Sequence, residues 1–434
     1  MRPFLQTTHR HLDKSFGDGH QDEKITLTGE KRMVWGGWHD AGDWDREAWH
    51  VNAANTLLLA YELAPGKFTD GELKIPESGN GIPDIVDEAR WCIDYYRRLQ
   101  RPDGGVSVGF FESSWPRHGE SSYTDSMGWF LYAEDPAASY RYAAGACRLA
   151  ACLAIAGKPA LARPYVENAK RAWEWAGRNL REGDAAKIRD DRFHAAAGLF
   201  RATGEKRFED AFKADLLIAT PDTKLYVWSQ HDQQWGVWAY VLTDRPGMDK
   251  ALRERLRRAA LHFADADYVA TAQKRGGRYG YEWSIPMWWG AATEPRTLPL
   301  MVAHRLSRDP KFLAPQYTTC DYMLGGNPLN MTWMTGLGAR SPREVFHPDS
   351  LHDKIPGPVA GIPPLGPYRY VPEKANGPWE PGYAQQVACY PDAKLWPPHE
   401  LWFENRLCPP TNEFTVGSMA AAASAYGYLC ADRR

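Results

Sequence analysis

The chain has 434 residues, of which 44% are hydrophobic and 24% charged, a composition typical of a soluble globular protein. Its 52 lysines and arginines nearly balance 54 acidic residues, so charge gives no reason to expect nucleic acid or an anionic membrane surface as a partner. The unusual feature is the aromatic content, 19 Trp, 21 Tyr and 15 Phe. This exceeds what a core needs, and wide flat rings suit stacking on a ligand.

Further absences narrow the class of protein. No stretch approaches the roughly 20 consecutive apolar residues of a membrane helix. The N-terminal sequence MRPFLQTTHRH has no apolar core after its basic start and is therefore not a signal peptide. The seven cysteines are scattered and form no CxxC pair, which favours buried thiols over a zinc site or a disulfide framework.

Apolar spacing predicts a helical protein. Residues 1–35 are polar, show no periodicity and are expected to be irregular. Helical spacing follows at about 46–63, 82–100, 136–156, 160–180, 190–203, 206–217, 231–243, 249–272, 296–307, 311–324 and 413–431. Period-two alternation is scarce. The pattern predicts an all-α domain of antiparallel helices without a large sheet.

Residues 325–411 break this helical pattern. They hold half of the chain's 32 prolines in a fifth of its length, together with aromatic residues such as Trp333, Trp379 and Trp396. A disordered linker would be poor in aromatics, whereas long loops in compact domains are usually functional. We therefore expect ordered loops draped over one end of the helical body, within a single domain spanning 1–434.

The densest short motif is GGWHDAGDWDRE at 36–47. Asp40 and Asp43 lie three residues apart on a Gly-rich turn before a helix, where two carboxylates could share a water or a metal ion. The simpler interpretation is that Asp43 or Asp45 caps the following helix. The surrounding tryptophans favour a surface that faces a sugar, because indole rings stack on pyranose faces.

A second acidic motif, TNEFTVGSMAAAASAYGYL, lies at 411–429. Asn412 can serve as the N-cap of a small-residue helix with Glu413 in its first turn, where an acid complements the helix dipole. That field lowers the pKa of Glu413 and opposes a role as proton donor. For Glu413 to act as an acid, burial or nearby carboxylates would have to raise its pKa by more than the helix field lowers it. Asp40 and Asp43 could supply that negative charge if the two ends of the chain meet.

Several segments, in order along 36–430, resemble glycoside hydrolase family 9, the inverting cellulases and related β-glucanases. The DAGD turn at 40–43 with its preceding Gly-Gly-Trp is similar to the family's catalytic-base motif, and Asn412–Glu413 is similar to its catalytic-acid motif. Further similar segments are GIPDIVDEARW at 81–91, AAAGLFRATG at 195–204, WWGA at 288–291, CDYMLGGNP at 320–328 and TGLGARSP at 335–342.

The resemblance implies an (α/α)6 barrel, a toroid of six helical hairpins, with its active site in a cleft at one end. It implies that Asp43 is the general base, that Asp40 positions the attacking water with it, and that Glu413 is the general acid. An inverting enzyme needs its two carboxyl functions about 6.5–9.5 Å apart, which leaves room for water.

The substrate-binding loop departs from the family pattern. SPREVFHPDS at 341–350 keeps His347 but has Phe346 and Pro348 where the family has a histidine and an arginine. Arg343, three residues earlier, is the candidate substitute. The run before the acid also differs, reading ELWFENRLCPPTNE at 400–413. Three tryptophans in or beside loops are further candidate sugar platforms, namely Trp115, Trp289 and Trp402.

No cofactor is required by this chemistry. Asp190–Asp191 resembles part of a structural calcium site of the family, although the preceding AAKIR offers few of the six to eight oxygens that calcium takes. The histidines show no HExxH spacing, so no other metal site is expected. The resemblance implies a secreted or periplasmic protein, with a cytoplasmic location open. A β-sandwich domain is common before this type of catalytic domain, and whether one preceded this chain, absent here, stays open.

We therefore expect an inverting hydrolase of β-linked glucans, acting on β-1,4 bonds, whose partner is a β-glucan oligo- or polysaccharide rather than nucleic acid or a membrane. An exo-acting β-glucosidase or exo-β-glucosaminidase would share the three carboxyl residues. From other classes, a non-catalytic carbohydrate-binding relative would not need all three. An all-α lyase or unsaturated-uronide hydrolase would favour a basic cleft.

Overall fold

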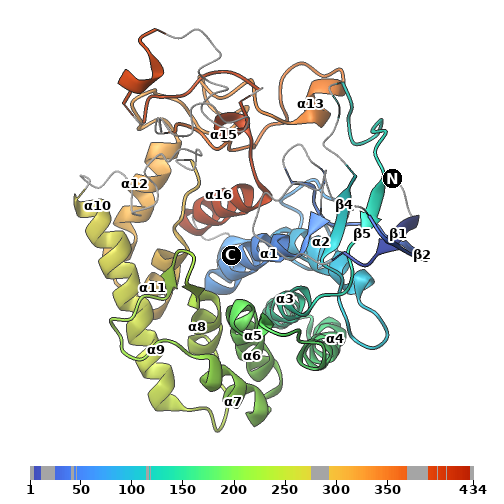
Figure 1. Ribbon diagram of the computed structural model, residues 1–434. Coiled ribbons are helices and arrows are strands. Elements are labelled where there is room, and N and C mark those ends of the chain that lie inside the picture. The colour runs from blue at the N-terminus through green and yellow to red at the C-terminus, as the bar shows by residue number, and fades with distance from the viewer. Residues whose placement is uncertain are drawn as a thin grey trace.

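The computed structural model describes residues 4–10, 25–40, 44, 46–113, 117, 119–274, 293–368, 390–397, 399–406 and 408–430. Helices dominate and are arranged as a ring, with the long loops gathered beyond α12, α13 and α15 (Figure 1). The helices are α1 (Val51–Leu63), α2 (Asp84–Leu99), α3 (Pro136–Ile155), α4 (Pro159–Arg178), α5 (Asp184–Lys187), α6 (Arg189–Thr203), α7 (Lys206–Asp215), α8 (Gln234–Val241), α9 (Lys250–Phe263), α10 (Ala270–Lys274), α11 (Leu298–Ser307), α12 (Ala314–Met323), α13 (Pro348–His352), α15 (Pro409–Asn412) and α16 (Val416–Leu429).

The helices form an inner and an outer set. The inner helices α1, α3, α6, α8 and α16 bury most of their residues, which matches their apolar or small-residue sequences. The outer helices α2, α4, α7 and α9 bury one face and expose charged residues on the other, as amphipathic surface helices do. The predicted helix spans are confirmed to within a few residues over most of the chain.

Packing follows a closed circuit. Helix α1 packs on α3, α3 on α6 and α6 on α8, while α16 returns from the C-terminus to pack on α1 and α11. Outer helices α2, α4, α7 and α9 each pack on the inner helix beside them in sequence. This is the predicted barrel of helical hairpins. The segments that precede inner helices meet: Asp40, before α1, contacts Val416 at the start of α16, and Arg46, before α1, pairs with Phe110 in the segment before α3.

A five-stranded sheet was not predicted. Its order is β2-β1-β5-β4-β3, and its strands are β1 (Phe4–Thr8), β2 (Leu27–Met33), β3 (Arg46–Glu47), β4 (Gly109–Glu112) and β5 (Trp129–Leu131). A separate two-stranded ribbon joins β6 (Tyr226–Val227) to β7 (His231–Asp232). The expectation that 1–35 is irregular is therefore wrong for the described residues, because β1 and β2 lie in that segment.

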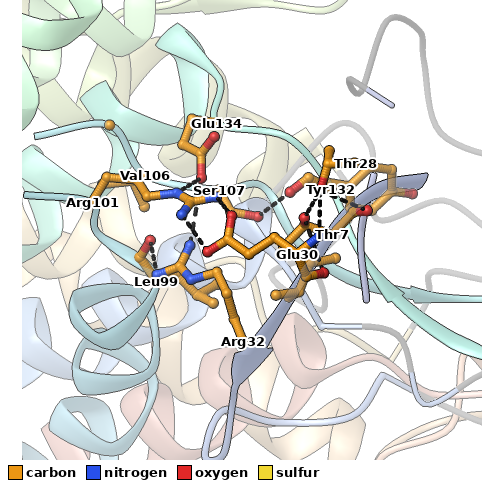
Figure 2. A network of polar contacts seen from close by, with 12 residues as sticks. Thr7, Thr28, Glu30, Arg32, Leu99, Arg101, Val106, Ser107, Tyr132 and Glu134 are labelled. Carbon is orange, nitrogen blue, oxygen red and sulfur yellow. Dashed lines mark hydrogen bonds and ion pairs between the residues drawn. The ribbon is translucent and has the colours of Figure 1, made fainter. Parts of the chain in front are cut away.

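Ion pairs attach the edge strand β2 to the C-terminal end of α2 (Figure 2). The two terminal nitrogens of Arg101 each donate to a Glu30 carboxylate oxygen at 2.7 Å, and Arg101 Nε donates to Glu134 at 2.6 Å. Arg32 donates to the carbonyl oxygen of Leu99 at 2.9 Å. The Arg32 bond satisfies a carbonyl that α2 leaves free at its end.

The main hydrophobic core is contiguous from Leu5 to Tyr428, so the sheet and the helical ring share it. Smaller clusters lie in the 322–414 region, including one around Trp333 and Trp402. Among the described helices, none combines the length and the apolar character needed to cross a bilayer.

Candidate active site

The two ends of the chain meet at Asp40. The backbone N–H of Val416, the first residue of α16, donates to Asp40 Oδ1 at 2.8 Å. Asp40 is buried, with 7% of its surface exposed. The sequence required the two ends of the chain to meet if a carboxylate of the first motif was to act on Glu413. Asp40 meets this requirement, because it contacts the acidic motif at the other end of the chain.

Helix α2 holds the segment that leads into Asp40. Trp91 Nε1 donates to the carbonyl oxygen of Gly37 at 2.9 Å, and Trp38 Nε1 donates to Glu88 Oε1 at 2.8 Å. Gly37 has a φ of +75°, and a Cβ there would lie 3.0 Å from the Tyr95 ring. The Gly-Gly-Trp sequence therefore allows the backbone to cross closely over α2.

Glu413 occupies an extended segment between α15 and α16, with φ −75° and ψ 165°. Its carbonyl oxygen accepts from Leu365 N–H, and that of Asn412 accepts from Phe346 N–H, both at 2.7 Å. The prediction that Asn412 caps the helix and that Glu413 lies in its first turn is wrong. Helix α16 begins at Val416, capped by Thr415 through a reciprocal pair of bonds with Ser418.

The environment of Glu413 suits a proton donor. Burial is the main cause that raises its pKa from 4.5 to about 8, and the negative charge of Asp40 raises it further. Glu413 precedes α16 and does not lie in its first turn, where the helix dipole would have lowered the pKa of the carboxyl group. Its carboxyl group is protonated at neutral pH, beside a second carboxyl from the opposite end of the chain.

Two neutral histidines, His39 and His347, lie next to residues of this pair: His39 precedes Asp40, and His347 contacts Phe414, which follows Glu413. His39 Nε2 lies 2.5 Å from Arg46 Nη2, and burial together with the Arg46 charge lowers the pKa of His39 to about 2. His347 Nδ1 lies 2.6 Å from Ser350 Oγ, and its ring packs edge-on against Phe414. Burial lowers the pKa of His347, which lies close enough to His39 to disfavour protonation there. His347 thus lies beside the candidate catalytic groups.

The other predicted site residues fall into two groups. Asp43, Trp115 and Trp289 lie outside the described residues. Arg343 is exposed, and its backbone N–H donates to the Glu404 carboxylate at 3.1 Å. The prediction that Trp402 is a sugar platform needs correction. The residue is only 9% exposed and packs edge-to-face on Trp333, with ring centroids 5.2 Å apart. It is part of a buried cluster rather than an open sugar platform.

The predicted loop region is tied to the rest of this end of the barrel. Ser122 donates from its backbone N–H and its hydroxyl to the two carboxylate oxygens of Asp349, at 2.6 and 2.7 Å. The loop before α3 is thereby joined to α13, which follows His347. The loop at 341–350, whose sequence differs from the family pattern, is therefore an ordered part of this region.

Asp190 and Asp191 are poorly arranged as calcium ligands. Asp191 Oδ1 accepts from Arg141 Nε at 2.9 Å, and Asp190 Oδ2 accepts from the backbone N–H of Asp232 at 2.7 Å. Each of these two oxygens accepts a hydrogen bond from the protein, whereas calcium takes six to eight oxygen ligands. Across the part of the chain that the structure describes, no group of three or more His, Cys, Asp or Glu residues is arranged to hold a metal ion.

Sequence reasoning missed the residues that position Asp40. Glu88 and Trp91 lie three apart on α2 and so share one helix face, a spacing visible in GIPDIVDEARW. Arg46 carried no signal of its own, because its contact with His39 depends on the β3–β4 pairing that the sequence did not predict.

Comparison with known proteins identifies the family. The sequence profile of glycosyl hydrolase family 9 matches residues 9–425. The chain is 26% identical over 448 residues to endoglucanase D of Acetivibrio thermocellus, covering 96% of this chain and 65% of that protein. It is 25% identical to a xyloglucan-specific endo-beta-1,4-glucanase of Bacteroides ovatus, covering 89% and 67% of the two chains.

Solved structures agree on the fold. A metagenome-derived family 9 endoglucanase matches 99% of this chain and 78% of its own with a TM-score of 0.74 and 24% identity. A single mutant of a thermostable endoglucanase from Alicyclobacillus acidocaldarius matches 99% and 82% with a TM-score of 0.77 and 23% identity. The fold is the predicted (α/α)6 barrel. The chain belongs to glycosyl hydrolase family 9.

Proposed function

We propose that the protein hydrolyses β-1,4-glucosidic bonds of glucans with inversion at the anomeric carbon. The observation that carries the proposal is the placement of Glu413, whose pKa burial and the Asp40 charge raise to about 8, beside Asp40 from the opposite end of the chain. Family membership supports it, as do the endoglucanase names of the relatives.

In the proposed reaction Glu413 gives its proton to the glycosidic oxygen while that oxygen leaves C1 as an alcohol. A water molecule attacks C1 from the opposite face. Its proton passes to Asp43, the base implied by the family motif, and Asp40 accepts a hydrogen bond from the same water. Neutral His39 and His347 add no positive charge that would lower the pKa of the acid.

The proton-donor role is tested by leaving-group dependence. Glu413→Gln should slow hydrolysis of β-glucan and aryl cellobiosides with poor leaving groups by about 10²–10⁴-fold. It should barely affect dinitrophenyl cellobioside, whose leaving group departs without a proton. Glu404→Gln, a change at a carboxylate that only accepts backbone N–H groups in the described structure, is the matched control. Equal losses on both classes of substrate would refute the acid role.

Stereochemistry and substrate choice are tested separately. Proton NMR of the earliest product from a β-linked substrate should show the α-anomer, and early β-anomer would rule out inversion. A panel of β-glucan, xyloglucan, chito-oligosaccharides and aryl glucosides should show fastest turnover on the β-1,4-glucans. Turnover confined to single-sugar release from chain ends would establish the exo-acting alternative.

We propose an extracellular or periplasmic location, because a polymeric β-glucan substrate lies outside the cytoplasm. Fractionation of the source cells followed by immunodetection tests this, and detection in the cytoplasmic fraction alone would contradict it.

A further inference from the structure

A buried ionic cluster crosses the interior of the barrel, away from the catalytic residues. Glu62 near the end of α1 lies 2.8 Å from Arg148 Nη1 of α3 and also pairs with Arg201 of α6. The side chains of Glu62 and Arg148 are 4% and 2% exposed. Two guanidinium groups thus share one carboxylate in the interior, and the cluster carries an excess positive charge.

The neighbouring titratable groups do not neutralise that charge. His194 of α6 stays neutral, because burial and the Arg148 charge lower its pKa well below the ordinary value. Cys147 and Cys152 of α3 stay as thiols, because burial raises the pKa of each. An uncompensated buried charge is costly, and removing one partner of a buried pair typically destabilises a protein by several kcal/mol.

One edge of Arg148 has no protein partner. Nη1 donates to Glu62 at 2.8 Å, whereas Nε and Nη2 are buried without a hydrogen-bond acceptor among the described residues. Nε and Nη2 form the side-on fork with which arginine binds an anion through two parallel N–H donors. Buried polar groups in native proteins are nearly always hydrogen-bonded, so this fork calls for an acceptor.

The wall beside the guanidinium is aromatic. The Arg148 Cζ lies 5.9 Å from the centroid of the Trp235 ring, and Trp235 stacks on His194 with centroids 6.0 Å apart. Trp235 and His194 keep 9% and 8% of their surface exposed, whereas Arg148 itself keeps 3%. Arg148 and the aromatic rings beside it are therefore all largely buried in the barrel interior.

We propose that the Nε–Nη2 edge of Arg148 binds a small monovalent anion of the chloride class inside the barrel. One negative charge balances the cluster, and one compact acceptor satisfies both free N–H groups. The site lies among the inner helices α1, α3, α6 and α8. A bound anion would therefore link side chains that come from these helices. The proposal is independent of the function proposed for Glu413.

Bromide is the probe for the site. Crystals soaked in sodium bromide and measured at the bromine absorption edge should show an anomalous peak within hydrogen-bonding distance of Arg148 Nε and Nη2. An ordered water there with no anomalous signal would overturn the proposal. This measurement uses the unaltered protein and does not depend on any variant folding.

Melting temperatures test occupancy in solution. At equal ionic strength, sodium chloride should raise the Tm above that in sodium gluconate by about 2 °C, with saturation. Arg148→Met removes the donors and Arg148→Lys keeps the charge without the fork, so both should lose this chloride dependence whatever their absolute stability. Arg163→Met, at an exposed arginine on α4, should keep it. Equal melting temperatures of the unaltered protein in the two salts would refute the site.

Discussion

Replacing Glu413 with glutamine should make the folded protein more stable at alkaline pH. The pKa of Glu413 is raised to about 8 in the fold, against 4.5 for an ordinary glutamate. The folded state therefore holds its proton more tightly than the unfolded chain. Stability from this group is complete below pH 4.5 and is lost as pH rises through 8, because the unfolded chain has by then released the proton.

The size of the effect follows from the pKa difference. At 1.36 kcal/mol for each pKa unit, a rise from 4.5 to about 8 costs about 5 kcal/mol once Glu413 is ionised. Glu413 keeps some solvent exposure, which screens its charge, so this figure is a ceiling. Glu413→Gln carries no charge at any pH and is free of this cost.

The assay is urea denaturation of both proteins from pH 4 to pH 9. The difference in unfolding free energy, variant minus unaltered protein, should rise steadily between pH 5 and 8 and then level off. Glu254→Gln, at an exposed glutamate on α9, should give a flat difference and serves as the control. Parallel curves for Glu413→Gln and the unaltered protein would refute the raised pKa and with it the basis of the acid role.

Three further changes have defined outcomes. Trp402→Ala should lower stability by about 3–5 kcal/mol with kcat/KM of the remaining folded enzyme little changed, because the ring fills a core; a selective rise in KM by substrate kinetics would restore its sugar-platform role. Gly109→Ala should cost more than about 3 kcal/mol by urea denaturation, because its φ is +139° and a Cβ would lie 1.7 Å from the Arg46 carbonyl oxygen; wild-type stability would contradict this β3–β4 geometry. Arg101→Met should cost about 1 kcal/mol at low salt and less at 1 M salt, since its partners are partly exposed; a salt-independent loss would mean that packing rather than charge dominates.

The helices could be predicted because each carries its own signal. Helix α2 has strong amphipathic spacing between Pro83 and Pro102, and its observed bounds differ from the prediction by two residues or fewer. The sheet had no comparable signal. Nearly all of β2 is exposed and all of β4 is buried, so neither strand alternates between the two environments, and β3 has only two residues.

The sequence predicted which residues form the candidate site but not their burial or contacts. Asp40, Glu413 and His347 were selected through the family motifs. The structure places Asp40 near Glu413 and His347 against Phe414, and this proximity depends on closure of the ring. The helix was predicted to begin too early because Asn412 was taken as its N-cap. The capping signal lies instead at Thr415 and Ser418, which are three residues apart. The burial of Trp402 could not be predicted, because its contacts come from residues 322–333, far away in sequence.

Closure of the barrel is itself what prepares the acid. Helix α16 packs on α1, and this contact brings the N–H of Val416 onto Asp40. That hydrogen bond stabilises negative charge on the Asp40 carboxylate. Burial is the main cause that disfavours ionisation of Glu413, and the Asp40 charge adds to it. Two carboxyl groups with different environments can thus take different roles at one pH: in the proposed reaction Asp40 stays charged and accepts a hydrogen bond from the water, while Glu413 holds the proton that it donates. Because the residues are 373 positions apart in sequence, the site forms only when the last inner helix docks on the first, so folding and activity should be lost together when that contact is weakened.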